Sequence, residues 1–303
     1  MMPTVALTGA TGFIGGVLLR HLVAQGVQVR ALSRQRTEPA SGVTWIAGSL
    51  ENDASLARLV TGADAVVHCA GAVRGATADT FIRTNVDGSR RLMTAARASG
   101  QCGRFLLISS LAARHPELSW YAASKREAER QLSELAGNLP LTVFRPTAVY
   151  GPGDRELRPL FEWLLRGWLF IPGSASARVS FLHVDDLAAA VASWLALRDP
   201  VSGVYELHDG RPGGYDWPAI ADAAEQVRHR PVRQIGIPLA LLAVLAHCNL
   251  ALSRLFGSTP MLTPAKLGEL RHPDWSCNNS AIEGVIPWTP RLELMQALKQ
   301  RRF

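Results

Sequence analysis

The sequence feature that most constrains the fold is a glycine-rich turn, TGATGFIGG, at residues 8–16. The apolar segment before it predicts a buried strand, and apolar residues at helical spacing after it predict a helix that ends at Gly26. Glycine at Gly9 and Gly12 lets the backbone approach a ligand, and the free N–H groups of a helix start favour an anion. The G-x-x-G-x-x-G spacing is one residue longer than the Rossmann fingerprint, so a dinucleotide site and a purely structural turn are equally good interpretations.

Strand-like and helical segments alternate through the first half of the chain. Strands are predicted at residues 4–8, 27–33, 43–47, 65–70, 105–109 and 141–145. Apolar strands joined by helices indicate an α/β fold, a Rossmann-type doubly wound parallel sheet covered on both faces. Proline and glycine become frequent after Tyr150, and a strand followed by an apolar helix returns at 181–198. We therefore predict two parts: an NAD(P)-binding Rossmann domain (1–150 plus 181–203) and a smaller C-terminal substrate-binding lobe (151–180 plus 204–303).

Composition narrows the class of partner. The net charge is +7, and no basic cluster is interleaved with aromatic residues, so we expect anionic ligands and no nucleic acid. No secretory signal pattern is evident at the N-terminus, which favours a cytoplasmic protein. The cysteines lack C-x-x-C pairing and are expected to be buried thiols rather than disulfides or metal ligands. They are Cys69, Cys102, Cys248 and Cys277.

A serine pair and a tyrosine–lysine pair are the candidate catalytic residues. A predicted strand ends at Ser109 and Ser110, and the helix that follows carries Tyr121 and Lys125. Residues four apart share one helix face, so the ammonium can lie near the phenol and lower its pKa from about 10. Such a phenol can exchange a proton with an alcohol or carbonyl oxygen that a serine hydroxyl holds. An isolated Y-x-x-x-K is usually a surface pair, but here it follows a strand-end serine pair and a glycine turn.

Five segments, TGATGFIG, ISS, YAASK, FRPTAVYGPGD and FLHVDDLA, occur in the order found in a known superfamily. The chain resembles the extended short-chain dehydrogenase/reductases, in their NAD-dependent epimerase/dehydratase group. The resemblance implies that Tyr121 is the acid/base residue and that Lys125 is its partner and a ligand of the nicotinamide ribose. Ser110 would orient the substrate oxygen, with Ser109 the weaker claimant. Asn85 matches the asparagine that supports the helix near the site, and an amide bonded to backbone within its helix is compatible with that role.

The resemblance also implies a cofactor site along the ends of the strands. Its residues would be Gly9, Thr11, Gly12, Phe13, Ile14, Gly15, Ser33, Arg34, Ser49, Leu50, Cys69, Ala70, Gly71, Ser109, Tyr121, Lys125, Pro146 and Val149. The third strand ends at Ser49, where the family usually has an aspartate.

The tip of the second strand decides between NAD and NADP. Enzymes that prefer NAD usually have an acidic residue there, whereas a 2′-phosphate is bound by arginine and a small hydroxyl residue. Ser33 and Arg34, with Arg36 close by, occupy this position. NADP(H) is therefore favoured over NAD(H), and the alternative is a set of solvated surface arginines.

His183, Asp185 and Asp186 suggest a metal site at first inspection. However, either aspartate can be the N-cap of a helix that starts near Leu187, and His183 ends a strand. We expect structural roles for all three and no metal.

The substrate is predicted from departures from the nucleotide-sugar enzymes of the group. These usually have an arginine four residues before His183, where this chain has Val179, with Arg178 one place away. The stretch from Ser110 to Tyr121 is also much shorter than in those enzymes. Both departures count against a nucleotide sugar. The uncharged distal segment 237–252 favours a hydrophobic ketone or alcohol. The chain resembles reductases that act on steroids, dihydroflavonols and 3-oxo-sphingoid or ceramide lipids.

Three functions remain open at this point. The first is an oxidoreductase for a small hydrophobic substrate, the second is a nucleotide-sugar epimerase or dehydratase, and the third is a non-catalytic dinucleotide-binding subunit. The uncharged segment at the start of 237–256 predicts either a core helix of the lobe or a helix in peripheral contact with a membrane. Helices over 80–99 and 120–136 resemble the pair that forms a dimer interface in the superfamily, so a homodimer is expected.

Overall fold

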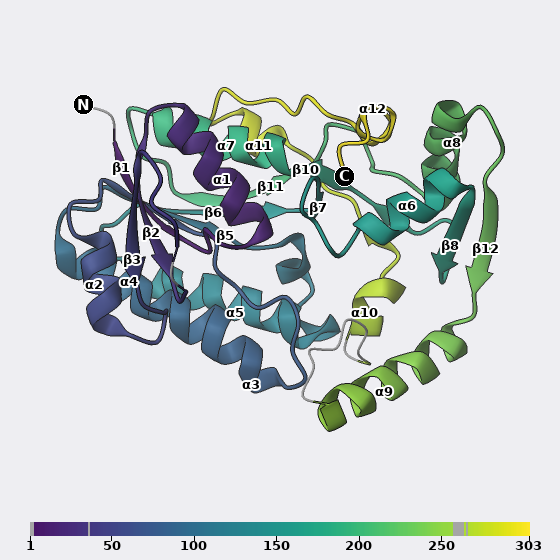
Figure 1. The fold of residues 1–303 in the computed structure, drawn as a ribbon, viewed down its shortest axis with the longest axis horizontal. Coiled ribbons are helices and arrows are strands. Elements are labelled where there is room, and N and C mark those ends of the chain that lie inside the picture. Colours follow the sequence, from purple (N-terminus) through teal and green to yellow (C-terminus); the bar gives the residue numbers. More distant parts are fainter. Residues whose placement is uncertain (1–2, 36, 257–263, 265) are drawn as a thin grey trace.

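A parallel seven-stranded sheet forms the centre of the computed structural model, which describes residues 3–35, 37–256, 264 and 266–303 (Figure 1). The strand order is β11-β6-β5-β4-β1-β2-β3. The strands are β1 Thr4–Thr8, β2 Gln28–Ser33, β3 Val43–Ala47, β4 Ala65–His68, β5 Arg104–Ile108, β6 Leu141–Pro146 and β11 Gly203–Leu207. The predicted Rossmann-type fold is confirmed, because apolar runs of this length are stable as parallel strands when both faces of the sheet are covered.

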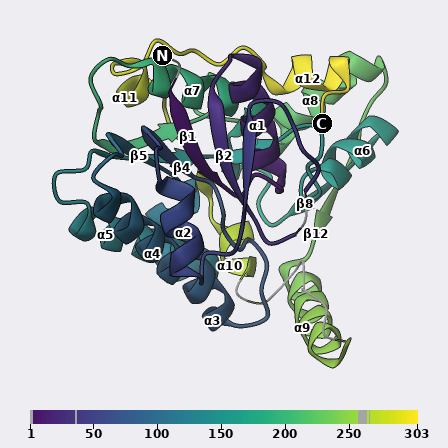
Figure 2. The same ribbon diagram turned by 60° about the vertical axis from the view of Figure 1, so that its left-hand side comes forward.

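Helices cover both faces of this sheet (Figures 1 and 2). On one face lie α1 Phe13–Ala24, α7 Val184–Ala196 and α11 Ser280–Glu283, and on the other α2 Asp53–Val60, α4 Gly88–Ser99 and α5 Trp120–Leu135. Side chains alternate along each strand, so Val5 and Leu7 of β1 enter the first core while Ala6 enters the second. Both faces of the sheet are therefore buried under apolar side chains. A ligand can reach the sheet only at its edges and at the ends of its strands.

The sheet reverses its winding between β1 and β4, and this position fixes where a ligand can bind. β1 pairs with β2 on one side and with β4 on the other, and Thr8 lies beside His68 at the carboxyl ends of the two strands. Ligands of doubly wound folds bind in the crevice at such a switch point. The glycine turn that follows β1 opens on this crevice.

A smaller lobe with a core of its own stands beside the carboxyl ends of the strands (Figure 1). Its elements include α6 Arg158–Arg166, α8 Trp217–Arg228, α9 Leu239–Phe256, α10 Lys266–Arg271 and α12 Leu294–Gln300. Three short parallel pairs complete it: β7 Ala148–Tyr150 with β10 Phe181–His183, β8 Trp168–Pro172 with β12 Arg233–Ile237, and β9 Arg178–Val179 with β13 Asp274–Trp275. Aromatic residues such as Tyr150, Phe161 and Phe181 fill its centre.

The boundary predicted at residue 203 falls at the start of a sheet strand. β11 begins at Gly203 and pairs along its length with β6, and Ile282 of α11 packs in the first core of the sheet. The sheet domain therefore extends beyond the predicted boundary. Residues 203–207 and the segment around α11 return to it from the C-terminal part of the chain.

The start of α7 corrects the expectation for the two aspartates. The helix begins at Val184, and its N-cap is His183, whose Nδ1 accepts a hydrogen bond from the Asp185 N–H at 3.2 Å. Asp185 pairs with Arg302, and Asp186 accepts from the Leu292 N–H at 3.0 Å. Both carboxylates therefore fasten the C-terminal segment rather than cap the helix.

The cysteines are unpaired, but they are not all buried. Cys277 is buried and Cys248 is exposed on α9, and the other two are intermediate. The helices predicted to form the dimer interface are present as α4, which a π-helical turn precedes, and α5. The homodimer itself stays a prediction.

Candidate active site

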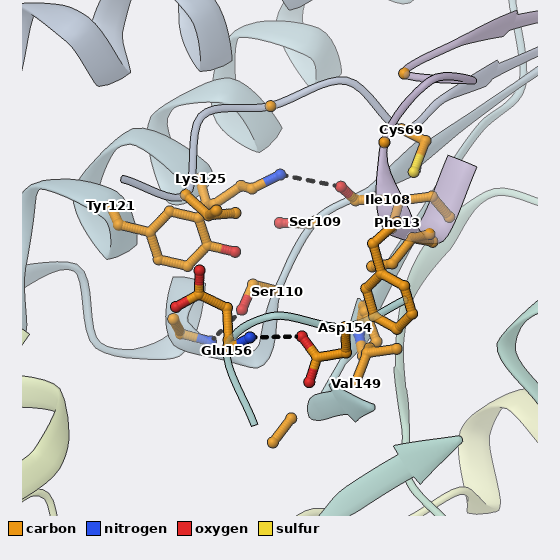
Figure 3. Close-up of a pocket in the computed structure, with 18 of the residues that line it drawn as sticks. Phe13, Cys69, Ile108, Ser109, Ser110, Tyr121, Lys125, Val149, Asp154 and Glu156 are labelled. Atoms are coloured by element: carbon orange, nitrogen blue, oxygen red, sulfur yellow. Dashed lines mark hydrogen bonds between the residues drawn. The ribbon is translucent and has the colours of Figure 1, made fainter. Parts of the chain in front are cut away.

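One large cavity extends from the glycine turn to the C-terminal lobe. Its volume is about 1150 Å³, and every residue of the predicted cofactor set lines it, as does Ser110. Asn85 lies outside the lining. Phe13 and Val149 lie across the cavity from Tyr121 (Figure 3).

The glycine turn has the geometry that close approach of an anion requires. Gly9 has a φ of +78°, and a Cβ added there would come within 2.7 Å of the Ala70 nitrogen. A Cβ on Gly15 would lie 2.1 Å from the Gly9 oxygen, so α1 can pack on the turn only with glycine at this position. Gly12 is the N-cap of α1, and no side chain caps the helix. The first N–H groups of α1 therefore remain available for the phosphates of a dinucleotide.

The candidate catalytic side chains converge on the same part of the cavity (Figure 3). Ser119 caps α5 by accepting from the Ala122 N–H at 3.0 Å, and this fixes the helix turn that carries Tyr121. The Tyr121 hydroxyl interacts with the Ser110 hydroxyl. Lys125 is buried, donates from Nζ to the Ile108 carbonyl at 3.1 Å, and lies 5.9 Å from the centre of the Tyr121 ring.

Burial dominates the protonation of this group. Burial raises the pKa of Tyr121 to about 12. The charge of Glu269 raises this pKa further, whereas the hydrogen bond with Ser110 lowers it. Burial also lowers the pKa of Lys125. The sequence predicts that Lys125 lowers the phenol pKa, and this prediction is wrong: burial raises the pKa and the lowering comes from Ser110, so the phenol carries its proton at neutral pH.

The two serines at the end of β5 have different partners. The Ser109 hydroxyl donates to the Glu129 carboxylate at 2.5 Å, and that carboxylate also binds the Arg145 guanidinium in a buried ion pair. The Ser110 hydroxyl accepts from the Ala112 N–H at 3.2 Å and faces Tyr121. Only Ser110 is therefore free to hold a substrate oxygen.

Asn85 connects the loop after β4 to the helix that carries Tyr121. It lies in the π-helical turn η1 (Ile82–Asp87), accepts from the Ala72 N–H at 2.7 Å, and donates to the Ala72 carbonyl at 3.0 Å and to Ser124 Oγ at 2.9 Å. π-Helical turns often occur at functional sites because they redirect one side chain. Asn85 therefore supports the site without lining the cavity.

Among the described residues, Arg34 is the free cation at the tip of β2. Ser33 is buried, and its hydroxyl donates to the Gln35 carbonyl at 2.9 Å and accepts from the Gln35 N–H at 3.2 Å. Arg34 is exposed on the cavity wall, and no group of the described residues binds its guanidinium. Arg36 lies outside the described residues. Of Ser33 and Arg34, Arg34 is therefore the better placed to bind a 2′-phosphate.

The end of β3 contributes Ser49 to the cavity lining. Ser49 accepts from the Glu51 N–H at 3.3 Å through its hydroxyl and from the Ser55 hydroxyl at 3.1 Å through its carbonyl. Leu50 lines the cavity beside it. No carboxylate stands at Ser49 to accept from the adenine amino group.

A segment of the C-terminal lobe lines the far end of the cavity, and no sequence pattern indicates it. Glu269, His272 and Trp275 line the cavity, and Ser119 donates a hydrogen bond to the Glu269 carboxylate. A Cβ on Gly268 would lie 2.3 Å from the Leu118 carbonyl oxygen, so α10 meets the chain before α5 backbone to backbone. Sequence spacing carries no signal of this contact because the partners lie 150 residues apart.

Arg178 also reaches the cavity wall, but it is already engaged. Its Nη1 donates to the Gly213 carbonyl at 2.8 Å. The neighbouring Val179 supplies no charge. Position 179, where a nucleotide-sugar enzyme is expected to have an arginine, therefore carries no charge.

Comparison with known proteins is consistent with this geometry. Residues 5–207 match the family described as NAD dependent epimerase/dehydratase family. The chain is 37% identical over 289 residues to a ceramide reductase of Caulobacter vibrioides, covering 93% of this chain and 89% of the relative. It is 33% identical to a 2-alkyl-3-oxoalkanoate reductase of Stenotrophomonas maltophilia, over 69% of this chain and 71% of the relative. In fold it is similar to a UDP-glucose 4-epimerase of Thermotoga maritima, with a TM-score of 0.75, 19% identity, and coverage of 98% of this chain and 96% of that one.

Proposed function

Because the chain belongs to the NAD-dependent epimerase/dehydratase family, we propose that it is an oxidoreductase that interconverts a carbonyl and a secondary alcohol on a hydrophobic, lipid-like substrate. The observation that carries the proposal is the convergence of Ser110, Tyr121 and Lys125 on one cavity that also holds the glycine turn. A cofactor placed over the glycine turn would reach Tyr121, and the cavity continues beyond Tyr121 to the C-terminal lobe. The cavity then has a place for the cofactor and a place for the substrate, which are the two parts that a hydride-transfer enzyme needs.

The residues present fit a nicotinamide dinucleotide. The uncapped start of α1 would bind the pyrophosphate, and Arg34 would bind a 2′-phosphate, which favours NADP(H) over NAD(H). Gly71 keeps the space beside Lys125 open, since a Cβ there would lie 3.2 Å from Nζ. Lys125 would therefore be within reach of the nicotinamide ribose. When bound, the nicotinamide supplies the hydride that reduces the carbonyl carbon.

The side chains supply the proton and the position of the carbonyl oxygen. In the reducing direction Tyr121 donates its phenolic proton to that oxygen, because burial keeps the phenol protonated through neutral pH. The Ser110 hydroxyl, held by the Ala112 N–H, donates to the same oxygen from a second side. The Lys125 ammonium stabilises the phenolate that remains until a proton returns from solvent.

The substrate class follows from the lining and from the relatives. Beyond the glycine turn, apolar side chains line the cavity beside polar ones such as Glu269 and His272. The apolar residues are Val73, Leu111, Leu157, Leu160, Phe181, Trp217, Leu270 and Trp275. Two relatives are named for lipid-like substrates, a ceramide and a 2-alkyl-3-oxoalkanoate. Position 179 is a valine, whereas nucleotide-sugar enzymes of the group usually have an arginine there, and this disfavours a nucleotide sugar. A 3-oxo-sphingoid or 3-oxo-ceramide ketone is the substrate that we propose.

NADPH oxidation measured with a panel of ketones tests this proposal. We expect turnover with 3-oxo-ceramide or 3-oxo-sphinganine, weaker turnover with a steroid ketone, and none with UDP-glucose or UDP-galactose. Interconversion of the two UDP-sugars without net NADPH consumption would instead identify an epimerase. Tight cofactor binding with no turnover of any ketone would identify a non-catalytic subunit.

A further inference from the structure

Helix α9 presents an apolar face that no part of the described chain covers. Leu241, Val244 and Leu245 are 50%, 60% and 49% exposed, and Cys248 continues the same stripe one turn later. Residues spaced i, i+3, i+4 and i+7 lie along one side of a helix. In Figures 1 and 2 this helix projects from the body of the molecule below β12.

The opposite side of α9 explains how the helix is attached. Leu242 and Ala246 are buried against Leu267 and Leu270 of α10. The helix is therefore apolar on two sides and uses one of them for packing. A surface helix of a globular protein is usually polar on the side that faces water, so the open stripe needs a partner.

A second apolar surface lies on β12, the strand that leads into α9, and on its partner strand β8. Phe170 of β8 and Ile235 of β12 are register partners and are both exposed. At the same edge the Arg233 guanidinium lies 5.4 Å from the Trp168 ring, and the Arg166 guanidinium lies 5.1 Å from the exposed Trp163 ring. Tryptophan and arginine beside aliphatic side chains are typical of surfaces that enter the headgroup region of a bilayer.

The charge around α9 is mainly positive. From residue 226 to 273 the chain carries six basic residues, Arg228, Arg230, Arg233, Arg254, Lys266 and Arg271, and one acid, Glu269. Glu269 accepts from Ser119 and lines the cavity, and α9 itself holds no acidic residue. An apolar stripe within a basic region complements a surface that is apolar beneath an anionic layer.

We propose that the open face of α9 docks on the surface of an anionic lipid bilayer. No helix of the described residues is long and apolar enough to cross a membrane, so the contact would be peripheral. α9 rests on α10, whose Leu270 and Glu269 line the cavity. Docking at this face therefore brings the far end of the cavity close to the bilayer, where a long-chain ketone would be dissolved.

Vesicle co-sedimentation tests the proposal without relying on enzyme activity. The protein is mixed with vesicles of phosphatidylcholine alone, or of phosphatidylcholine with phosphatidylglycerol. We expect binding to the anionic vesicles that weakens with added salt, and little binding to the neutral ones. The double variant Leu241→Asp/Val244→Asp places two charges on the open face and should lower the affinity at least about tenfold. Both positions are exposed, so the variant should fold and bind NADPH normally.

Met295→Asp is the matched control, because Met295 is 40% exposed on α12, which belongs to a different surface. It should bind anionic vesicles as the parent does. Failure of the parent to bind, or equal binding by the double variant, would overturn the proposal. A change in molecular mass of the double variant without lipid, measured by light scattering, would also overturn it and would assign this face to a contact between copies of the chain.

Discussion

The Glu269 carboxylate is hydrogen-bonded to the Ser119 hydroxyl, and Ser119 is the N-cap of the helix that carries Tyr121 and Lys125. One side chain of the C-terminal lobe thus reaches both the cavity and the helix of the candidate acid. Its charge raises the pKa of Tyr121, in addition to the larger effect of burial. The lobe therefore influences the proton chemistry of the sheet domain.

The first prediction concerns this coupling. Glu269→Gln removes the charge and keeps the hydrogen-bonding shape, so the pKa of Tyr121 should fall below its value of about 12. Reduction needs the protonated phenol, and therefore the alkaline decline of kcat/KM should move to lower pH. The pH dependence of NADPH oxidation measures this shift. Glu117→Gln is the control, since that carboxylate lies outside the cavity lining, and an identical profile for Glu269→Gln and the parent would contradict the coupling.

The second prediction concerns cofactor choice. Arg34→Ala should weaken NADPH binding by about 1.5 to 3 kcal/mol, the free energy of a charge-assisted contact, and leave NADH binding nearly unchanged. Titration calorimetry of both cofactors measures the difference. Arg90→Ala, at an exposed position outside the cavity lining, should bind both cofactors as the parent does. Equal affinity of the parent for NADPH and NADH would refute the preference.

Local sequence signals predict the fold and the part of the cavity wall that runs from the glycine turn to Tyr121 and Lys125. The glycine turn, the strand-end serines and the i, i+4 pair each depend on neighbours within a few residues, so their geometry follows from strand and helix periodicity. Glu269 reaches the site only because Gly268 lets α10 touch the Leu118 carbonyl, and no local pattern encodes that contact. β11 was missed for a similar reason, because it is a short strand whose pairing with β6 is decided by tertiary packing.

Sequence patterns also do not indicate which groups the polar side chains bind. The pattern favoured Asp185 or Asp186 as a helix cap, yet the imidazole of His183 takes that position because the strand and helix are contiguous. Likewise, the family resemblance favours Ser110 over Ser109 for the substrate oxygen, but the sequence does not show which side chains engage the Ser109 hydroxyl. The answer depends on Glu129 and Arg145, which lie on other elements.

The third prediction concerns that serine pair. Ser110→Ala should lower kcat by roughly tenfold or more, because its hydroxyl faces the cavity. It should lower the free energy of unfolding by no more than about 1 kcal/mol, because the hydroxyl accepts one hydrogen bond, from the Ala112 N–H. Ser109→Ala should do the opposite. It removes a hydrogen bond to a buried carboxylate, so the free energy of unfolding should fall by about 1.5 to 3 kcal/mol while kcat stays within a few-fold of the parent. The kcat and the urea unfolding of both variants test this prediction. A large loss of kcat in Ser109→Ala, with a loss of stability in Ser110→Ala, would reverse the assignment of the two serines.

The fourth prediction concerns acid stability and rests on His68, which lies beneath the glycine turn. Ser89 donates to the Asn85 carbonyl at 2.5 Å, so His68 Nε2 must donate to Ser89 Oγ, at 2.8 Å. Nδ1 is then the acceptor from the Thr8 hydroxyl at 2.6 Å. A second proton would remove this acceptor, which agrees with the lowering of the His68 pKa from 6.5 to about 3, caused first by burial and then by Lys125.

The sign of the effect follows from these values. The unfolded chain binds a proton below pH 6.5, and the folded chain does not until about pH 3, so this stabilisation is complete above pH 6.5 and is lost as the pH falls. The loss should be about 1.4 kcal/mol per pH unit in that window. Urea unfolding at several pH values should show this slope in the parent and a smaller one in His68→Gln. His21→Gln, on the partly exposed side of α1, is the control and should keep the slope of the parent.

The last prediction concerns Tyr121 as the proton donor. Tyr121→Phe removes only the hydroxyl, and the ring can still pack edge-on against Phe81, so folding and NADPH binding should survive. Turnover of a long-chain ketone should fall by roughly 10²-fold or more, which is the contribution of a positioned acid. Lys125→Met should lower turnover and weaken NADPH binding as well, because its ammonium is expected to contact the ribose. Stopped-flow NADPH absorbance and a binding titration separate the two effects. If Tyr121→Phe bound NADPH normally and turned over within a few-fold of the parent, the proton would have to come from another group, and Tyr121 would lose its assigned role.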